Sequence, residues 1–195
     1  MNFIKRLFGG ILILAVLLGM TYLGHTSLAI TFMIFSLIAI KEITDALSKI
    51  DINTPVGLLY ICDIAIMLSA GFLPSDFYIL AIILSAIAVL AFMLISRESE
   101  LRDIFASTFI LSYVSLLMSS IVRIGDLRFV WPLYITAWGS DTFAYLTGSL
   151  IGKNKIEAIR HISPNKTIEG FVGGILGSVL LNIIYFKYAP LDINI

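Results

Sequence analysis

The chain consists mainly of long apolar runs separated by short polar segments. Four runs contain no charged residue, at 7–24, 77–96, 104–122 and 170–186. Three more lie at 26–40, 56–73 and 129–151, and the last two of these contain a single acid each, Asp63 and Asp141. A helix needs about 20 mostly apolar residues to cross the ~30 Å hydrocarbon core of a bilayer. The pattern therefore predicts an all-α, polytopic integral membrane protein with about seven transmembrane helices.

The composition agrees with a membrane protein and excludes several other classes. Of the 195 residues, 59% are hydrophobic and 13% are charged, and the mean hydropathy is +1.01. A soluble domain of this length could not bury so much apolar surface in one core. This excludes an ordinary soluble enzyme, a disordered chain and a nucleic-acid-binding protein with a basic face. The single cysteine, Cys62, excludes a disulfide framework or a cysteine zinc site within one chain.

The Lys and Arg residues between the apolar runs predict the orientation. With the N-terminus inside, ten of them lie on the cytoplasmic side: Lys5, Arg6, Lys41, Lys49, Arg97, Arg102, Lys153, Lys155, Arg160 and Lys166. Three lie on the opposite side: Arg123, Arg128 and Lys187. Because basic residues concentrate in cytoplasmic loops, we expect a cytoplasmic N-terminus. Lys5 and Arg6 also fit the start of a signal peptide, but the length of the apolar run favours an uncleaved anchor.

An acid inside one apolar run is the first candidate for chemistry. Asp141 lies about eleven residues, or ~16 Å of helix, from the predicted cytoplasmic end of its run. An ionised carboxylate at that depth is costly unless it faces a cation, a polar cavity or a partner. Four residues share its helical face and would let another helix or a ligand approach closely: Ala144, Tyr145, Gly148 and Gly152. We favour a metal or cation ligand over a hydrogen-bonded acid that locks two helices together.

Two further features each allow a functional and a purely structural interpretation. Lys153 and Lys155 are either phosphate-binding residues or headgroup-level charges that bind anionic lipid nonspecifically. Asp63 has no motif around it, so we favour a buried, hydrogen-bonded acid over a functional one.

The motif SPNKTIEG begins at Ser163 and combines helix-capping residues with charges. Ser163 or Asn165 is expected to cap a helix that opens near Thr167, where free N–H groups and the helix dipole favour phosphate. Lys166 would add a positive charge at the same place. Glu169 is three residues further on, so we expect the two side chains to share one face of the helix. Glu169 would then bind a cation or position Lys166.

These motifs resemble those of the CDP-diacylglycerol synthases, the phosphatidate cytidylyltransferases. The shared pattern is Asp-x-x-Ala-Tyr-x-x-Gly-x-x-x-Gly-Lys, a short basic stretch, and Ser-Pro-x-Lys-Thr-x-Glu-Gly-x-x-Gly-Gly, which here runs from Asp141 to Gly174. Position 168 is Ile where many members have Trp. A further family signature, which includes His-Gly-Gly-x-x-Asp-Arg-x-Asp, is not found in these 195 residues. We therefore expect an N-terminal part of such an enzyme, with transmembrane helices in 1–103 and the motif-bearing helices in 104–195.

The resemblance implies an enzyme of a bacterial inner membrane that transfers a cytidylyl group from CTP to phosphatidate, with Mg²⁺ as cofactor. It implies catalytic roles for Asp141, Lys166 and Glu169, of which Asp141 and Glu169 would hold the metal ion. The residues implied in binding substrate phosphates are Lys153, Lys155, Ser163, Asn165 and Thr167. The implied partners are CTP, phosphatidate and the lipid bilayer, without nucleic acid, and a homodimer is left open. Whether this chain by itself is active is also left open.

Two other activities remain as alternatives. CTP-dependent polyprenol kinases have a similar Asp … Lys-Thr-x-Glu-Gly pattern but transfer the γ-phosphate to a lipid alcohol. The Ser-Pro-x-Lys-Thr run favours the cytidylyltransferase. An ion-coupled transporter would use Asp63 and Asp141 as intramembrane acids, but transport would not require Lys166 and Glu169.

The distribution of basic residues places 152–169 in the cytoplasm. In a Cys62→Ser background, a cysteine introduced by Asn154→Cys should therefore react with an impermeant maleimide in inside-out vesicles and not in right-side-out vesicles. Reaction from the periplasmic or lumenal side alone would overturn this topology.

Overall fold

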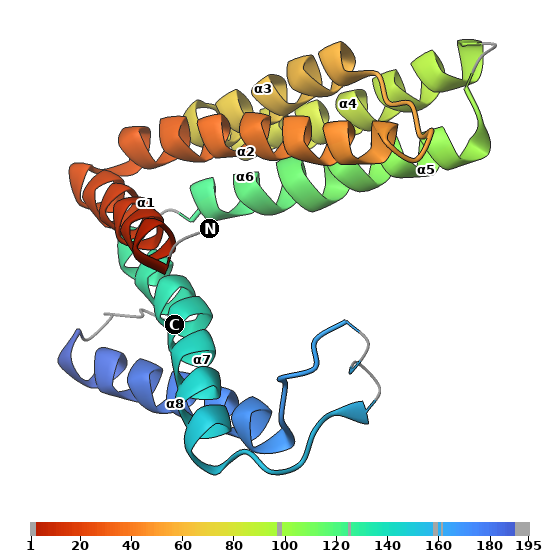
Figure 1. Ribbon diagram of the computed structural model, residues 1–195. Coiled ribbons are helices and arrows are strands. Elements are labelled where there is room, and N and C mark those ends of the chain that lie inside the picture. Colours follow the sequence, from red (N-terminus) through yellow and green to blue (C-terminus); the bar gives the residue numbers. More distant parts are fainter. Residues whose placement is uncertain (1–2, 97–98, 125, 158–159, 161, 190–195) are drawn as a thin grey trace. The chain divides into compact units, whose positions relative to one another are not determined.

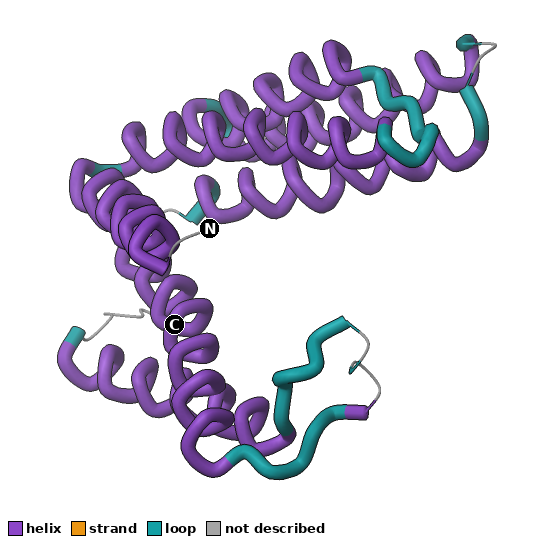
Figure 2. The backbone as a smooth tube through the Cα atoms, in the orientation of Figure 1, coloured by secondary structure: helices purple, strands orange, loops and turns teal. Residues whose placement is uncertain are grey.

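The computed structural model describes residues 3–96, 99–124, 126–157, 160 and 162–189, and helices dominate this part of the chain (Figures 1 and 2). The chain divides into two compact units, Met1–Gly125 and Asp126–Ile195. The first unit contains α1 (Phe3–Leu23), α2 (His25–Ser48), α3 (Val56–Phe72), α4 (Ser75–Ile95), α5 (Leu101–Ile110), the π-helical segment η1 (Leu111–Leu116) and α6 (Leu117–Val122). The second contains the short 3₁₀ segment η2 (Leu127–Phe129), α7 (Val130–Ile151) and α8 (Ile168–Tyr188).

Every apolar run recognised in the sequence corresponds to a helical stretch, which confirms the all-α prediction. Among the residues that the structure describes, four helical stretches are long and apolar enough to cross a membrane: α2, α4, the continuous stretch Leu101–Val122, and α8. Helix α3 is apolar but shorter, at 17 residues. The protein is thus a helical membrane protein, while seven crossings and a cytoplasmic N-terminus stay predictions. Arg97, one of the residues used to predict the orientation, lies outside the described residues.

Local sequence explains where several helices begin. Gly24 separates α1 from α2 with a φ of 106°, which a side chain would strain. Pro55 and Pro74 immediately precede α3 and α4, where a missing N–H breaks no helical hydrogen bond. The Asp103 carboxylate accepts the backbone N–H of Glu100 at 2.9 Å and that of Asn53 at 2.9 Å. One side chain therefore caps α5 and also holds the loop between α2 and α3.

An apolar core shared by α2, α3, α4 and the continuous stretch of α5 and η1 holds the first unit together. Its buried members are Ile40 of α2, Leu59, Cys62 and Ile66 of α3, Val89 and Met93 of α4, and Ile110, Leu111 and Val114 of α5 and η1. Apolar side chains also cover outward surfaces, as Phe77, Leu84 and Leu94 of α4 illustrate. Contiguous apolar surface of this kind is unfavourable in water and marks contact with another apolar phase. This distribution agrees with helices surrounded by acyl chains.

Asp63 is enclosed in the packing of the first unit. It is 0% exposed, and the Ser36 hydroxyl, also 0% exposed, donates to one of its carboxyl oxygens at 2.6 Å. The other carboxyl oxygen and the buried Ser115 hydroxyl have no hydrogen-bond partner among the described residues. The structure thus confirms a buried, hydrogen-bonded acid, which joins α3 to α2.

Replacing Asp63 separates the contribution of its hydrogen bond from that of its charge. Asp63→Ala leaves a cavity and removes the acceptor of Ser36, so the free energy of unfolding should fall by ~1–3 kcal/mol. Asp63→Asn keeps an oxygen acceptor without burying a charge and should be at least as stable as the parent. Thermal unfolding in detergent measures both, with exposed Asp45→Ala as the control. If Asp63→Asn were as destabilising as Asp63→Ala, the carboxylate charge itself would be required.

Candidate functional site

Helices α7 and α8 approach each other so closely that glycine is required at their crossing. A Cβ atom on Gly170 would lie 2.8 Å from the carbonyl oxygen of Ala144, and one on Gly174 would lie 2.8 Å from the carbonyl oxygen of Ser140. Gly170 and Gly174 are four residues apart and lie on one face of α8. Ser140 and Ala144 are also four residues apart and lie on one face of α7. Close approach through small residues is typical of helix pairs in membranes. Ala144 and Gly148 of the face predicted beside Asp141 thus contact α8, whereas Tyr145 of that face is 73% exposed.

Thr167 extends this contact to the start of α8. Its side chain is buried, and a Cβ atom on Gly148 would lie 3.1 Å from its hydroxyl oxygen. The hydroxyl accepts the backbone N–H of Gly170 at 3.1 Å, which makes Thr167 the N-cap of α8. The predicted cap at Ser163 or Asn165 is therefore wrong. Thr167 is held in an extended conformation by its pairing with Lys155, so the helix cannot begin before Ile168.

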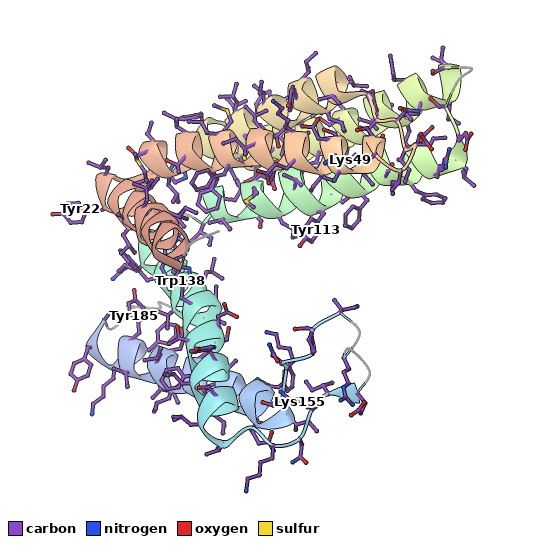
Figure 3. All side chains as sticks on the ribbon, in the orientation of Figure 1. Tyr22, Lys49, Tyr113, Trp138, Lys155 and Tyr185 are labelled. Atoms are coloured by element: carbon purple, nitrogen blue, oxygen red, sulfur yellow. The ribbon has the colours of Figure 1, made fainter. Side chains whose placement is uncertain are left out.

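The loop between the two helices turns back on itself and pairs near its ends. Lys155 and Thr167 form an isolated antiparallel bridge. The backbone N–H of Ile156 donates to the carbonyl oxygen of Lys166 at 3.2 Å, and the N–H of Ile168 donates to that of Asn154 at 2.9 Å. Figure 3 shows Lys155 on this loop, near the first turn of α8. The pairing gathers residues from both arms of the loop beside the two helices.

A cavity of about 830 Å³ lies among α7, the loop and α8. Its lining comprises Ser140, Asp141, Ala144, Tyr145, Gly148 and Ser149 of α7; Lys155, Ile156, Ser163, Asn165, Lys166 and Thr167 of the loop; and Gly170, Phe171, Gly174 and Ile175 of α8. One carboxylate and two ammonium groups therefore border the same space, next to apolar side chains. Such a cavity can accept a ligand that has both an anionic and an apolar part.

Most of the residues predicted for a site line this cavity, but two do not. Asp141, Lys155, Lys166, Ser163, Asn165 and Thr167 are brought together there. Lys153 and Glu169 are not among the lining residues. The expectation that Lys166 and Glu169 share a helix face is wrong, because Lys166 precedes the cap and α8 begins at Ile168.

Glu169 has a partner that the motif analysis did not identify. Its carboxylate oxygens lie 3.1 and 3.2 Å from the backbone nitrogen of Asn154, which donates to them, and one of them accepts the Asn154 side-chain amide at 2.7 Å. The two residues are 15 positions apart, and they meet only because the loop returns. A sequence pattern contains no signal for such a contact.

Asp141 is the carboxylate best placed to hold a metal ion. Its side chain is exposed to the cavity, and no described residue forms a hydrogen bond or an ion pair with its carboxylate. Within the described ranges, no three His, Cys, Asp or Glu side chains cluster as a metal site. Mg²⁺ typically binds through one or two protein carboxylates together with substrate phosphates and waters. The residues present fit that kind of site better than a cage built by protein ligands alone.

Comparison with known proteins gives a consistent result. The sequence profile described as "Cytidylyltransferase family" matches residues 4–194. A phosphatidate cytidylyltransferase of Staphylococcus haemolyticus is 29% identical over 195 residues, an alignment that covers 97% of this chain and 74% of that protein. Phosphatidate cytidylyltransferases of Staphylococcus epidermidis strain RP62A and Staphylococcus aureus strain COL are 29% and 27% identical over 202 and 196 residues, with the same coverage of both chains.

The contact between α7 and α8 can be tested at Gly174. Gly174→Ala places a methyl group against a backbone oxygen that cannot rotate away, so the helices must separate, at a cost of ~1–3 kcal/mol in unfolding free energy. Gly57→Ala in α3 is the matched control, because a Cβ there has nothing within 4 Å. Thermal unfolding in detergent should show a lower midpoint for Gly174→Ala only. Equal midpoints for the two variants would contradict the close crossing.

Proposed function

This chain belongs to the cytidylyltransferase family and is a nucleotidyltransferase, and we propose that it transfers the cytidylyl group of CTP to phosphatidate. The products would be CDP-diacylglycerol and pyrophosphate. The observation that supports this most directly is the cavity bordered by Asp141, Lys155 and Lys166 at the start of α8. The similarity to staphylococcal phosphatidate cytidylyltransferases supports phosphatidate as the acceptor.

The reaction requires two anions to meet. A phosphate oxygen of phosphatidate would attack the α-phosphorus of CTP, and the bond from that phosphorus to the oxygen bridging to the β-phosphate would break. Pyrophosphate would leave with the bonding electrons. Catalysis of this kind depends mainly on alignment and on neutralising negative charge. The protein groups that matter are therefore those that hold phosphates in place.

The loop and the start of α8 would bind these phosphates. Lys155 and Lys166 would supply positive charges, and the helix dipole at the first turn of α8 would add to them. Ser163 and Asn165 would form hydrogen bonds to phosphate oxygens. Thr167 accepts a hydrogen bond from the helix but retains its own hydroxyl proton, which it could donate. Each of these five residues borders the cavity.

Asp141 would hold the Mg²⁺ ion that we propose as cofactor. When bound, Mg²⁺ would neutralise phosphate oxygens of the triphosphate. The Asp141 carboxylate, which has no partner among the described residues, supports this assignment, because a carboxylate inside a membrane protein needs a cation or a polar surrounding. Glu169 faces Asn154 instead, so we do not assign it to the metal. Lys153 lies off the cavity and would interact with lipid headgroups.

The same cavity could also receive the lipid. Phe171 and Ile175 of α8 border it with apolar side chains that are 62% and 48% exposed. Acyl chains could lie against these residues while the phosphate reaches the lysines. We propose a bacterial cell membrane as the location, with the loop between α7 and α8 on the cytoplasmic side, where CTP is present.

Lys166→Ala tests the assignment of the phosphate site. Removing one preorganised charge from a transition-state site costs ~10²–10³ in rate, and we expect a loss of this size in CDP-diacylglycerol formation. Lys166→Arg should restore activity only in part, because a planar guanidinium is not equivalent to a compact ammonium. The measurement is incorporation of label from CTP into lipid by the purified protein. Exposed Lys49→Ala in the first unit is the control, and near-normal activity of Lys166→Ala would refute the assignment.

The position of the label also separates the two CTP-dependent reactions. With phosphatidate as acceptor, label on the α-phosphate should enter the lipid and label on the γ-phosphate should leave with pyrophosphate. A polyprenol kinase would instead transfer the γ-label to a polyprenol.

A further inference from the structure

Asn154 connects the two ends of the loop that contains the phosphate-binding lysines. It lies three residues after the last residue of α7, and Glu169 is the second residue of α8. The backbone N–H of Asn154 donates to both Glu169 carboxylate oxygens, and its side-chain amide donates to one of them at 2.7 Å. Its carbonyl oxygen accepts the N–H of Ile168 at 2.9 Å. The backbone N–H, the backbone carbonyl and the side-chain amide of Asn154 are thus all used to bind the first turn of α8.

The contact lies at the exposed surface of the loop, but it differs from a contact between two side chains because it also holds the backbone at residue 154. Hydrogen bonds to an ionised carboxylate are roughly twice as strong as neutral ones. One donor is a backbone N–H, which has no side-chain rotamers to restrict when the bond forms. The contact therefore determines where the chain passes at residue 154, and Lys155 follows immediately.

The consequence for the cavity follows from the neighbouring pairs. Directly beyond this contact, Lys155 pairs with Thr167 and Ile156 with Lys166. If the Asn154–Glu169 contact opened, the frame that places Lys155 and Lys166 at the cavity would lose its support at the end nearest the helices, and only the backbone pairs would remain. Ordering each loop residue again would cost about 1–2 kcal/mol of backbone entropy.

We infer that Asn154 is a positioning residue of the site and that the Glu169 carboxylate acts through it, by holding Lys155 and Lys166 at the phosphate-binding cavity. This inference rests on the proposed function for the consequence in catalysis, but the contact itself does not. Within the contact, Glu169 is an acceptor of hydrogen bonds rather than a metal ligand. An amide–carboxylate pair with the two groups exchanged would serve the same purpose.

Exchanging the amide and the carboxylate between positions 154 and 169 tests this inference. Asn154→Asp places two carboxylates against each other and should open the contact. The double variant Asn154→Asp/Glu169→Gln restores one amide and one carboxylate and has the same net charge as the parent protein. The amide oxygen introduced at position 169 could still accept the backbone N–H of residue 154. Glu157→Gln is the matched control, because it breaks a different contact of this loop, the ion pair to Arg160 at 3.1 Å, and leaves the Asn154–Glu169 contact untouched.

Two measurements are made on each variant in detergent. Limited trypsin digestion follows cleavage after the loop residues Lys153, Lys155, Arg160 and Lys166, and it requires no activity. Label transfer from CTP to phosphatidate gives KM for CTP and kcat. For Asn154→Asp we expect faster loop cleavage and a loss in kcat/KM of ~10²-fold, the size typical of a displacement of about 1 Å at a catalytic site. The double variant should recover most of the resistance to trypsin and most of kcat/KM. Glu157→Gln should match the parent protein in both measurements.

The outcomes distinguish the inference from the proposed function. Failure of the double variant to recover loop protection would overturn the inference, whatever the activity. Recovered protection with an activity as low as that of Asn154→Asp would also overturn it, because the Glu169 carboxylate would then be needed for itself. If the parent protein transferred no label while the cleavage pattern followed the expected order, the proposed function would fail and the positioning contact would stand.

Discussion

The close crossing of α7 and α8 is the constraint on which the rest of the second unit depends. Backbone oxygens of α7 lie too close to Gly170 and Gly174 of α8 to leave room for a Cβ atom at either position. Any other residue at these positions would therefore push the two helices apart. The crossing determines how far Asp141 on α7 lies from the first turn of α8. It also brings Thr167 against Gly148, which sets the point where the loop must end. The cavity between these elements is thus a product of helix packing rather than of the loop alone.

Two acids within apolar helices illustrate how surroundings determine what a carboxyl group can do. Asp63 is fully enclosed and its oxygen is bound by the Ser36 hydroxyl, so it serves to join α2 and α3. Asp141 is exposed to a cavity and is unpaired among the described residues. A buried, hydrogen-bonded polar group makes the packing around it more rigid and more specific, whereas an accessible carboxylate can accept a cation. Both residues carry a carboxyl group, but only that of Asp141 is accessible to a ligand.

The loop between α7 and α8 combines flexible charged side chains with a paired backbone. Lysine carries a compact, strongly hydrated charge on a flexible stem, and a backbone that is already ordered reduces the entropy lost when such a side chain binds a ligand. Backbone pairing from Asn154 to Ile156 with Lys166 to Ile168 supplies that support. The carboxylate of Glu169 reinforces it at the end nearest the helices. The two lysines that border the cavity and the hydrogen bonds that order their backbone thus lie within a few residues of one another.

What could be predicted from the sequence follows from local properties of the chain. Apolar runs identify the helices because hydropathy acts on each segment separately, and the spacing of Ala144, Tyr145 and Gly148 after Asp141 identifies a face because helical geometry is regular. The motif beginning at Ser163 singled out polar residues in the same way, and the structure brings Ser163, Asn165, Lys166 and Thr167 to one cavity. Only the tertiary structure decided that Thr167 caps α8, that Lys153 lies away from the cavity, and that Glu169 binds Asn154. Those facts depend on where the loop returns, and its return is governed by contacts between residues far apart in the chain, which no local pattern encodes.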